Sequence, residues 1–188
     1  MFSAQEITQY TQGDCHLLCY SLYRFYNKGS IAEIFYPGED EESEHSLFSF
    51  EDGKNTYMDI CGSYSSLDHI SESWKELTSN PDTMCRWQTK EFAYDVRVWN
   101  TPQEIEEWWN RHSYIYTERD IKRTELFIQE NLERLRNQPL MTDERCFEIK
   151  KKIWGENSFI EIDVSEIIKK AIRGEPIDFS KYTLFEKV

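Results

Sequence analysis

Residues 13–27 read GDCHLLCYSLYRFYN and carry the clearest structural signal in the chain. Apolar side chains recur there every three or four positions, which predicts a helix with one face on the core. The members of that face are Cys15, Leu18, Cys19, Leu22 and Tyr26. Asp14 occupies a position where N-cap residues are preferred, and Asn27-Lys28-Gly29 forms a stop signal. The predicted helix therefore begins with a cysteine.

Strands are predicted on the C-terminal side of this helix. Residues 31–36 (IAEIFY) are short and rich in apolar side chains. Residues 45–50 (HSLFSF) and 55–61 (NTYMDIC) flank Asp52-Gly53, which predicts a hairpin. The EDEESE run at 39–44 is expected to be a solvated acidic loop.

The rest of the chain alternates between the two kinds of element. A helix is expected from Ser66 to just before Asn80, and alternation within 84–99 predicts a strand. Thr101-Pro102-Gln103-Glu104 is a capping box that opens a helix. Further elements are expected: helices at 118–137, 142–154 and 165–173, and a short strand at 159–164. We therefore expect an α+β core over residues 1–100, with a mostly helical part, 101–188, packed on it.

Composition limits the partners of the protein. The chain has 188 residues with 22 Lys+Arg against 35 Asp+Glu, a net charge of −13, so its surface should repel nucleic acids and anionic membranes. No apolar run approaches a membrane span, and the first residues lack the features of a signal peptide. We expect a soluble cytoplasmic protein that binds neither nucleic acid nor membrane.

The cysteines argue against a structural framework of disulfides or zinc. Five are present, an odd number, and no two form a CxxC pair. Free thiols are the expected state, with no metal and no cofactor.

Three residues in the first third of the chain have the types and positions needed for thiol chemistry. The start of a helix lowers the pKa of a thiol such as that of Cys15. His45 begins one hairpin strand and Asp59 lies near the end of the other, so the predicted turn sets them opposite each other. A carboxylate there would orient the imidazole, whose other nitrogen would pair with the thiol. The backbone N–H of Cys15 is the expected oxyanion donor.

The patterns GDCHLLCYSLYRF and HSLFSFEDGKNTYMDICG resemble papain-like and transglutaminase-like cysteine hydrolases and acyltransferases, over about residues 10–65. The resemblance implies a papain-like core of a helix against a small antiparallel sheet. It also implies Cys15 as nucleophile, His45 as base and Asp59 as the residue that orients the base. By the same resemblance, the oxyanion and support positions are Gln12, Gly13 and Asp14.

Structural alternatives remain for each of these residues. Cys15 is alternatively a small buried apolar residue of the core. Cys19, one turn further along, is expected in the core and is the alternative nucleophile. His45 is alternatively an ordinary strand histidine. Asp59 is alternatively a structural acceptor for backbone N–H groups near Gly62.

The other histidines and the tryptophans are expected outside the site. His16 should point away from Cys15 and lie at the surface, since successive helical residues diverge. His69 and His112 fall in predicted helices as solvent-facing or packing residues. The tryptophans expected to pack between elements are Trp74, Trp108 and Trp109.

Two functions follow from these observations. The first is a cysteine-dependent acyl-transfer enzyme, a peptidase, deamidase or transglutaminase type, acting on a protein or a peptide-like amide. The second is a non-catalytic acidic module of the same fold that binds or inhibits a basic protein partner.

Overall fold

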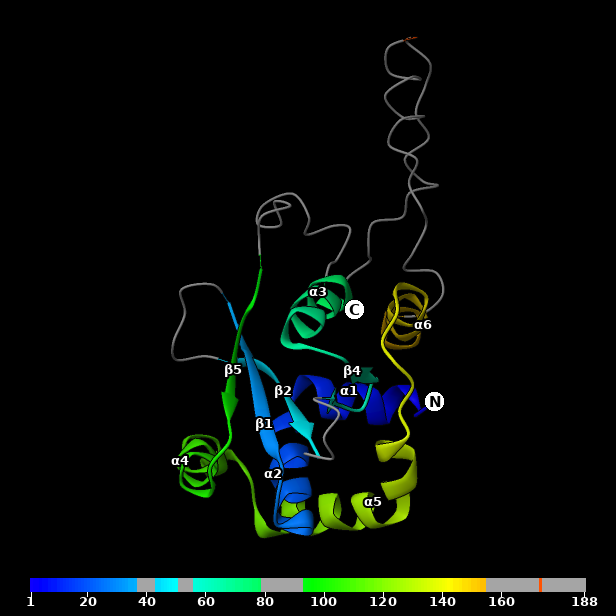
Figure 1. Cartoon of the computed structure of the whole chain (residues 1–188). Helices are drawn as coiled ribbons and strands as arrows, with labels where there is room; N and C mark the ends of the chain where they lie inside the picture. Colours follow the sequence, from blue (N-terminus) through cyan, green and yellow to red (C-terminus); the bar gives the residue numbers. More distant parts are fainter. Residues whose placement is uncertain (37–42, 51–55, 79–92, 155–172, 174–188) are drawn as a thin grey trace.

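The computed structural model of the chain describes residues 1–36, 43–50, 56–78, 93–154 and residue 173. In these residues the fold is mixed α+β, with helices around a five-stranded antiparallel sheet of order β4-β3-β2-β1-β5 (Figure 1). The strands are β1 (Ser30–Phe35), β2 (Ser43–Ser49), β3 (Tyr57–Met58), β4 (Ser63–Tyr64) and β5 (Asp95–Trp99). The helices are α1 (Ala4–Gln12), α2 (Cys15–Tyr26), α3 (Leu67–Thr78), α4 (Pro102–His112), the short 3-10 helix η1 (Ser113–Ile115), α5 (Glu118–Arg136) and α6 (Asp143–Trp154).

Strand β1 lies between β2 and β5 and is buried along its whole length. In its ladder with β2, Glu33 lies opposite Ser46 and Ile34 lies opposite His45. Successive strand residues point to opposite faces of a sheet, so Glu33 and His45 belong to different faces. The two polar networks described below therefore start from different faces of the sheet, and both reach the Cys15 thiol.

The predicted hairpin forms, but its second strand is shorter and its register differs from the expected one. Strand β3 contains only two residues, and it pairs Phe48 with Met58. Extending that register would put Asp59 opposite Leu47, two residues from His45. Asp59 therefore lies beyond the end of the ladder. The Asp52-Gly53 turn lies outside the described residues.

Helix α2 follows its prediction and leads into β1 through a tight turn. Asn27 ends the helix in the left-handed region, with φ 52°. Gly29 has φ +120°, and a Cβ atom there would lie 2.6 Å from the carbonyl oxygen of Ser49 and 2.5 Å from the Phe48 ring. Only glycine permits this backbone angle and this approach of the turn to β2.

Among the described residues, capping boxes open α1, α4 and α5, the last through Thr117 and Asp120. The predicted box of Thr101 and Glu104 begins α4, with Pro102 in the first turn. No helix was predicted at residues 4–12, yet Ser3 and Glu6 form the same motif at the start of α1. The Ser-x-x-Glu spacing was the signal that could have identified α1.

The helices surround the sheet on several sides (Figure 1). Helix α2 packs against β2 and α5, α4 lies beside β5, and α3 packs against α6. A 2.8 Å ion pair between Lys150 and Glu76 joins the last two helices. The helices predicted at 118–137 and 142–154 are thus confirmed with small changes of bounds. The elements predicted at 159–164 and 165–173 lie outside the described residues, apart from residue 173.

A segment of the C-terminal half holds the loop that follows β3. Pro139 accepts a hydrogen bond from the backbone N–H of Ser63, and Met141 donates one to the Ser63 carbonyl. Side chains add two more bonds to this loop: Gln138 donates to the carbonyl of Ile60 at 2.9 Å, and Arg145 to that of Cys61 at 2.8 Å.

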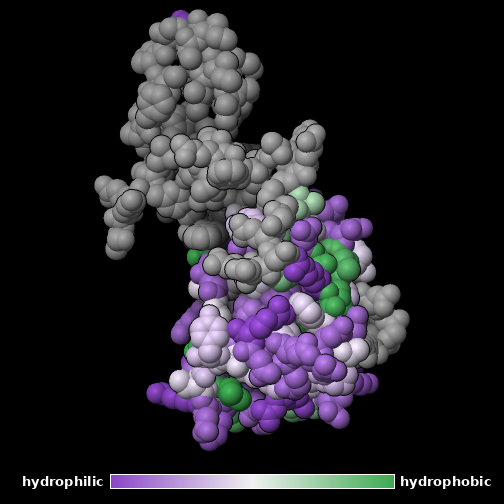
Figure 2. All heavy atoms as spheres, turned by 90° about the vertical axis from the view of Figure 1, so that its left-hand side faces the viewer, coloured by the Kyte–Doolittle hydropathy of each residue, from purple (hydrophilic) through white to green (hydrophobic). Residues whose placement is uncertain are grey.

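The surface is largely polar where it is described. Figure 2 shows hydrophilic side chains dominating the side that carries α4 and β5, with apolar residues scattered between them. Among the described residues, none of the helices combines the length and the apolar character that a membrane crossing requires.

Candidate active site

Cys15 is the first residue of α2 and is buried, with 4 % of its surface exposed. The two residues before it direct their backbone N–H groups to the carbonyl of Gln9, so α1 and α2 meet at this point. The N–H groups of Gly13 and Asp14 are therefore already bonded. Because the first N–H groups of a helix lack intrahelical acceptors, the N–H of Cys15 is better placed than those of Gly13 and Asp14 to donate to a ligand.

The three residues expected to support Cys15 have different surroundings. Asp14 occupies the N-cap position as predicted, but its side chain does not cap the helix. Its carboxylate instead accepts hydrogen bonds from Gln9 and Arg123, each at 2.8 Å. Gly13 accepts a 2.8 Å hydrogen bond from the Tyr116 hydroxyl, and Gln12 is exposed at the end of α1. Gln9, rather than Gln12, is the glutamine that holds the entry to α2.

His45 and Asp59 form a buried pair. The Nε2 atom of His45 lies 2.9 Å from Oδ2 of Asp59, and both side chains are at most 1 % exposed. Tyr64 donates a 3.1 Å hydrogen bond to the same carboxylate oxygen. The other oxygen, Oδ1, accepts the backbone N–H groups of Cys61 and Gly62 at 2.7 and 2.9 Å. Asp59 therefore fills both roles considered from the sequence: it orients His45 and it caps the loop.

The ring of His45 is fixed in position. It stacks on Trp74 with 4.2 Å between ring centroids and an interplanar angle of 4°. Its Nδ1 atom is buried and forms no hydrogen bond. The Cys15 thiol is nonetheless close enough to this ring for each group to shift the pKa of the other. Trp74, expected only to pack, thus covers one face of the imidazole.

Electrostatics favour a charged pair. Burial raises the pKa of the Cys15 thiol, but His16 and then His45 lower it, and the result is a pKa well below the ordinary value. Burial lowers the pKa of His45, while the bond to Asp59 and then Cys15 raise it to about 9. A thiolate beside an imidazolium is the state that these shifts favour.

The other described thiols have the opposite tendency. Burial raises the pKa of Cys19 and of Cys61 well above the ordinary value, and it raises that of Cys146 to about 11. All four described cysteines are free, as expected, and Cys85 lies outside the described residues. Cys19, the alternative nucleophile, therefore lacks the electrostatic support that Cys15 has.

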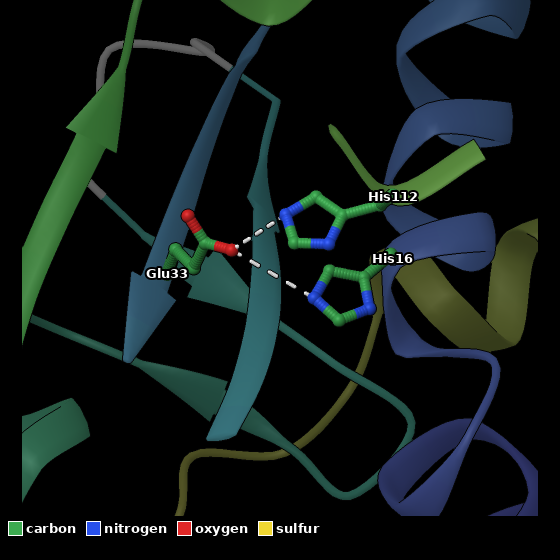
Figure 3. Close-up of side chains that lie close together, drawn as sticks. All are labelled: His16, Glu33 and His112. Atoms are coloured by element: carbon green, nitrogen blue, oxygen red, sulfur yellow. Dashed lines mark ion pairs between the residues drawn. The ribbon is translucent and has the colours of Figure 1, made fainter. Parts of the chain in front are cut away.

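A second polar network reaches the same thiol, and the sequence analysis missed it. His16 was expected to point away from Cys15, but its Nδ1 lies 3.6 Å from the Cys15 sulfur. The prediction was wrong because it compared directions around a helix axis, whereas a ring on the first turn can bend back along the end of the helix. The Nε2 of His16 faces Glu33 at 3.7 Å, and that of His112 lies 2.9 Å from the same oxygen (Figure 3).

The remaining predicted positions complete the surroundings. His69 bonds the Met141 carbonyl at 2.9 Å, apart from the Cys15 pair, and Trp108 is fully buried. Trp109 packs as expected, in a stack that runs from Tyr20 through Trp109 to Tyr116. Burial raises the pKa of Tyr116, and the charge of Cys15 raises it further.

No protein-family model, curated protein or solved structure matches this chain. We therefore base its function on the geometry of the site.

Proposed function

We propose that this chain is a cysteine-dependent acyl-transfer enzyme with a papain-like catalytic core. Cys15 is the nucleophile, His45 the general acid and base, and Asp59 the residue that orients His45. One observation carries the proposal: His45 is bonded through Nε2 to a buried carboxylate at 2.9 Å, while its free Nδ1 belongs to the ring that interacts with the Cys15 thiol. A nucleophile, a base and an orienting acid in this order are the elements of a thiol triad.

The first half-reaction would form a thioester. The Cys15 thiolate attacks the carbonyl carbon of an amide, a C–S bond forms, and the carbonyl electron pair moves onto oxygen. The backbone N–H at the start of α2 stabilises this oxyanion. When the oxyanion collapses, the C–N bond breaks and the imidazolium of His45 gives its proton to the leaving nitrogen.

The second half-reaction would release the acyl group. Neutral His45 takes a proton from water or from an amine, which attacks the thioester carbon. Collapse of this second oxyanion expels the Cys15 thiolate and gives an acid or a new amide. The protonated imidazole then restores the ion pair, and none of these steps needs a cofactor.

The contrast among the thiols favours catalysis over a purely binding role. A module that only binds a basic partner has no use for one thiol with a lowered pKa between two imidazoles, next to Cys19 with a raised one. Perturbed groups of this kind are typical of functional sites.

The test uses p-nitrophenyl acetate, a small activated acyl donor. We expect the full-length protein to release a burst of p-nitrophenol equal to the enzyme concentration and to carry an acetyl group on Cys15, detected by peptide mass spectrometry. Cys15→Ala should abolish the burst. Cys19→Ala is the matched control, one helical turn away, and should keep it.

Two results would contradict the proposal. One is the absence of a burst from the folded wild-type protein. The other is an equal burst from the wild-type protein and from Cys15→Ala. In either case, a salt-sensitive complex with a basic protein that survives Cys15→Ala would support the binding module.

A further inference from the structure

We propose that His16, Glu33 and His112 form a binding site for a divalent metal of the Zn²⁺ class, in which no residue of the triad is a ligand and His16 also contacts Cys15. The three side chains come from α2, β1 and α4, and they converge although up to 96 positions separate them in the chain. Figure 3 shows both imidazoles pointing toward the carboxylate. The sequence analysis expected no metal, because no short spacing motif links these residues.

The spacing of the three donor atoms suits one ion. In a tetrahedral zinc site with bonds of about 2.0 to 2.1 Å, neighbouring ligand atoms lie about 3.3 Å apart. Oε1 of Glu33 is 2.9 Å from Nε2 of His112 and 3.7 Å from Nε2 of His16, values on either side of that spacing. All three donor atoms lie within 4.8 Å of one another. Changes of about 0.4 Å would bring both carboxylate–nitrogen distances to the spacing of a tetrahedral site.

The carboxylate itself is the second observation in favour of a ligand. Glu33 is 1 % exposed, and its Oε1 accepts no well-aligned hydrogen bond, although His112 is close. Its other oxygen, Oε2, accepts the indole N–H of Trp99 at 3.1 Å. A buried carboxylate oxygen without an aligned donor is unfavourable. The Trp99 bond orients the side chain so that this oxygen faces the two histidines.

The surroundings of the histidines fit a metal site with an open position. Their side chains are 13 % and 18 % exposed, which leaves access for an ion and a water ligand. The Ser43 hydroxyl lies 2.8 Å from the Nε2 of His16, and an incoming metal would displace it from that nitrogen. Two imidazoles and one carboxylate favour zinc and neighbouring metals over Mg²⁺ or Ca²⁺, which prefer oxygen.

The opposing interpretation is a purely structural ion pair. The rings of His16 and His112 stack with centroids 3.9 Å apart, and stacking alone gives them a packing role. A structural pair, however, needs no external ion and would be indifferent to one. Metal binding is therefore the property that separates the two interpretations.

The experiment titrates Zn²⁺ into the full-length protein in competition with a chromophoric chelator at neutral pH. We expect one zinc per chain, bound with a dissociation constant in the micromolar range or below. Glu33→Gln and His112→Gln should each weaken binding by about 10- to 100-fold or more, since loss of even an outer-shell partner has that effect. His69→Gln is the control, because His69 bonds the Met141 carbonyl and none of the three ligands, and it should stay within about threefold of the wild type.

The spectrum of bound Co²⁺ gives a second readout. We expect bands of a nitrogen and oxygen site without a thiolate-to-cobalt charge-transfer band. His112→Gln changes a partly exposed residue, so it remains a valid test if Glu33→Gln fails to fold. The proposal is overturned by the absence of zinc binding, by unchanged binding in a folded His112→Gln variant, or by a charge-transfer band that Cys15→Ser removes. These readouts do not depend on acyl transfer, so either proposal can fail alone.

Discussion

Cys15 and Cys19 lie one turn apart on α2, both almost fully buried, yet their thiols differ chemically. Burial raises the pKa of each, but only Cys15 has imidazoles beside it, and its pKa ends well below the ordinary value. The pKa of Cys19 ends well above that value, because the nearby charges of Cys15 and Asp59 add to burial. Neighbouring charges, rather than depth, therefore decide which thiol has the lower pKa.

The difference between Cys15 and Cys19 is tested most directly by measuring the reactivity of each thiol. With iodoacetamide at pH 7, we expect Cys15 to be alkylated about 100-fold faster than Cys19 or more, because the thiolate is the reacting form. Quantitative peptide mass spectrometry resolves the individual cysteines. Equal and slow modification of all five cysteines would show that the site does not activate Cys15.

The second prediction concerns His45 and pH. His45→Gln removes one of the cationic neighbours of Cys15, so the pKa of the thiol should rise. Alkylation at pH 6 should then slow by about tenfold, while at pH 10, where an ordinary thiol is ionised, the two proteins should react alike. His69→Gln is the matched control, because His69 bonds the Met141 carbonyl rather than Cys15. If the rate of Cys15 alkylation depends on pH in His45→Gln as it does in the wild type, the result would contradict the pairing of His45 with Cys15.

The third prediction concerns the rate of acyl transfer at alkaline pH. The pKa of His45 is raised to about 9, so the imidazolium is present below that pH and is lost above it. Acylation by p-nitrophenyl acetate needs only the thiolate, whereas release of a poor amine leaving group needs the proton. We therefore expect amide turnover to fall above about pH 9 while the ester burst persists. If amide turnover and the ester burst fall together, the loss above pH 9 comes from unfolding rather than from deprotonation of His45.

The order of the two cysteines should be reversed for stability: substitution of Cys19 should destabilise the protein more than substitution of Cys15. Cys19→Ser introduces a hydroxyl into the apolar core and should lower the free energy of unfolding by about 1 to 3 kcal/mol. Cys15→Ser places the same hydroxyl beside two imidazoles, so we expect a loss below about 1 kcal/mol. Urea denaturation of both variants gives the comparison. A larger loss at position 15 would show that the thiolate is a main structural contact.

The smallest effect is expected at Tyr116. Tyr116→Phe removes the hydrogen bond to the Gly13 carbonyl, which should lower the free energy of unfolding by about 0.5 kcal/mol. Tyr114→Phe is the control, since Tyr114 is 84 % exposed and should give no measurable change. Thermal unfolding of both variants tests the difference. Equal effects would indicate that the bond beside the α2 entry adds nothing to stability.

The sequence predicted those features of the fold that depend on residues close together in the chain. The helix that begins with Cys15, its stop at Asn27 and the capping box of Thr101 all depend on residues within a few positions of one another. The pairing of His45 with Asp59 was predicted through a hairpin whose register is two residues off, and it forms because the aspartate lies beyond the ladder.

The second network could not be predicted in the same way. Glu33 is one acidic residue within the predicted strand at 31–36, for which the sequence predicted no role, and His112 was expected to be a solvent-facing or packing residue of a helix. Their meeting with His16 depends on how α4 docks beside the sheet, which no short sequence window contains. The stack of Trp74 on His45 is equally a product of tertiary packing.

The bonds between the loop after β3 and the segment around Pro139 have a consequence for synthesis of the chain. Cys15, His45 and Asp59 leave the ribosome early, but Ser63 receives its two backbone partners only when residues 139 and 141 have emerged. The carboxylate side of the His45–Asp59 pair is thus held by chain that is made well after both residues. A nascent or truncated protein that ends before Pro139 would carry Cys15 and His45 with the Asp59 carboxylate less firmly fixed.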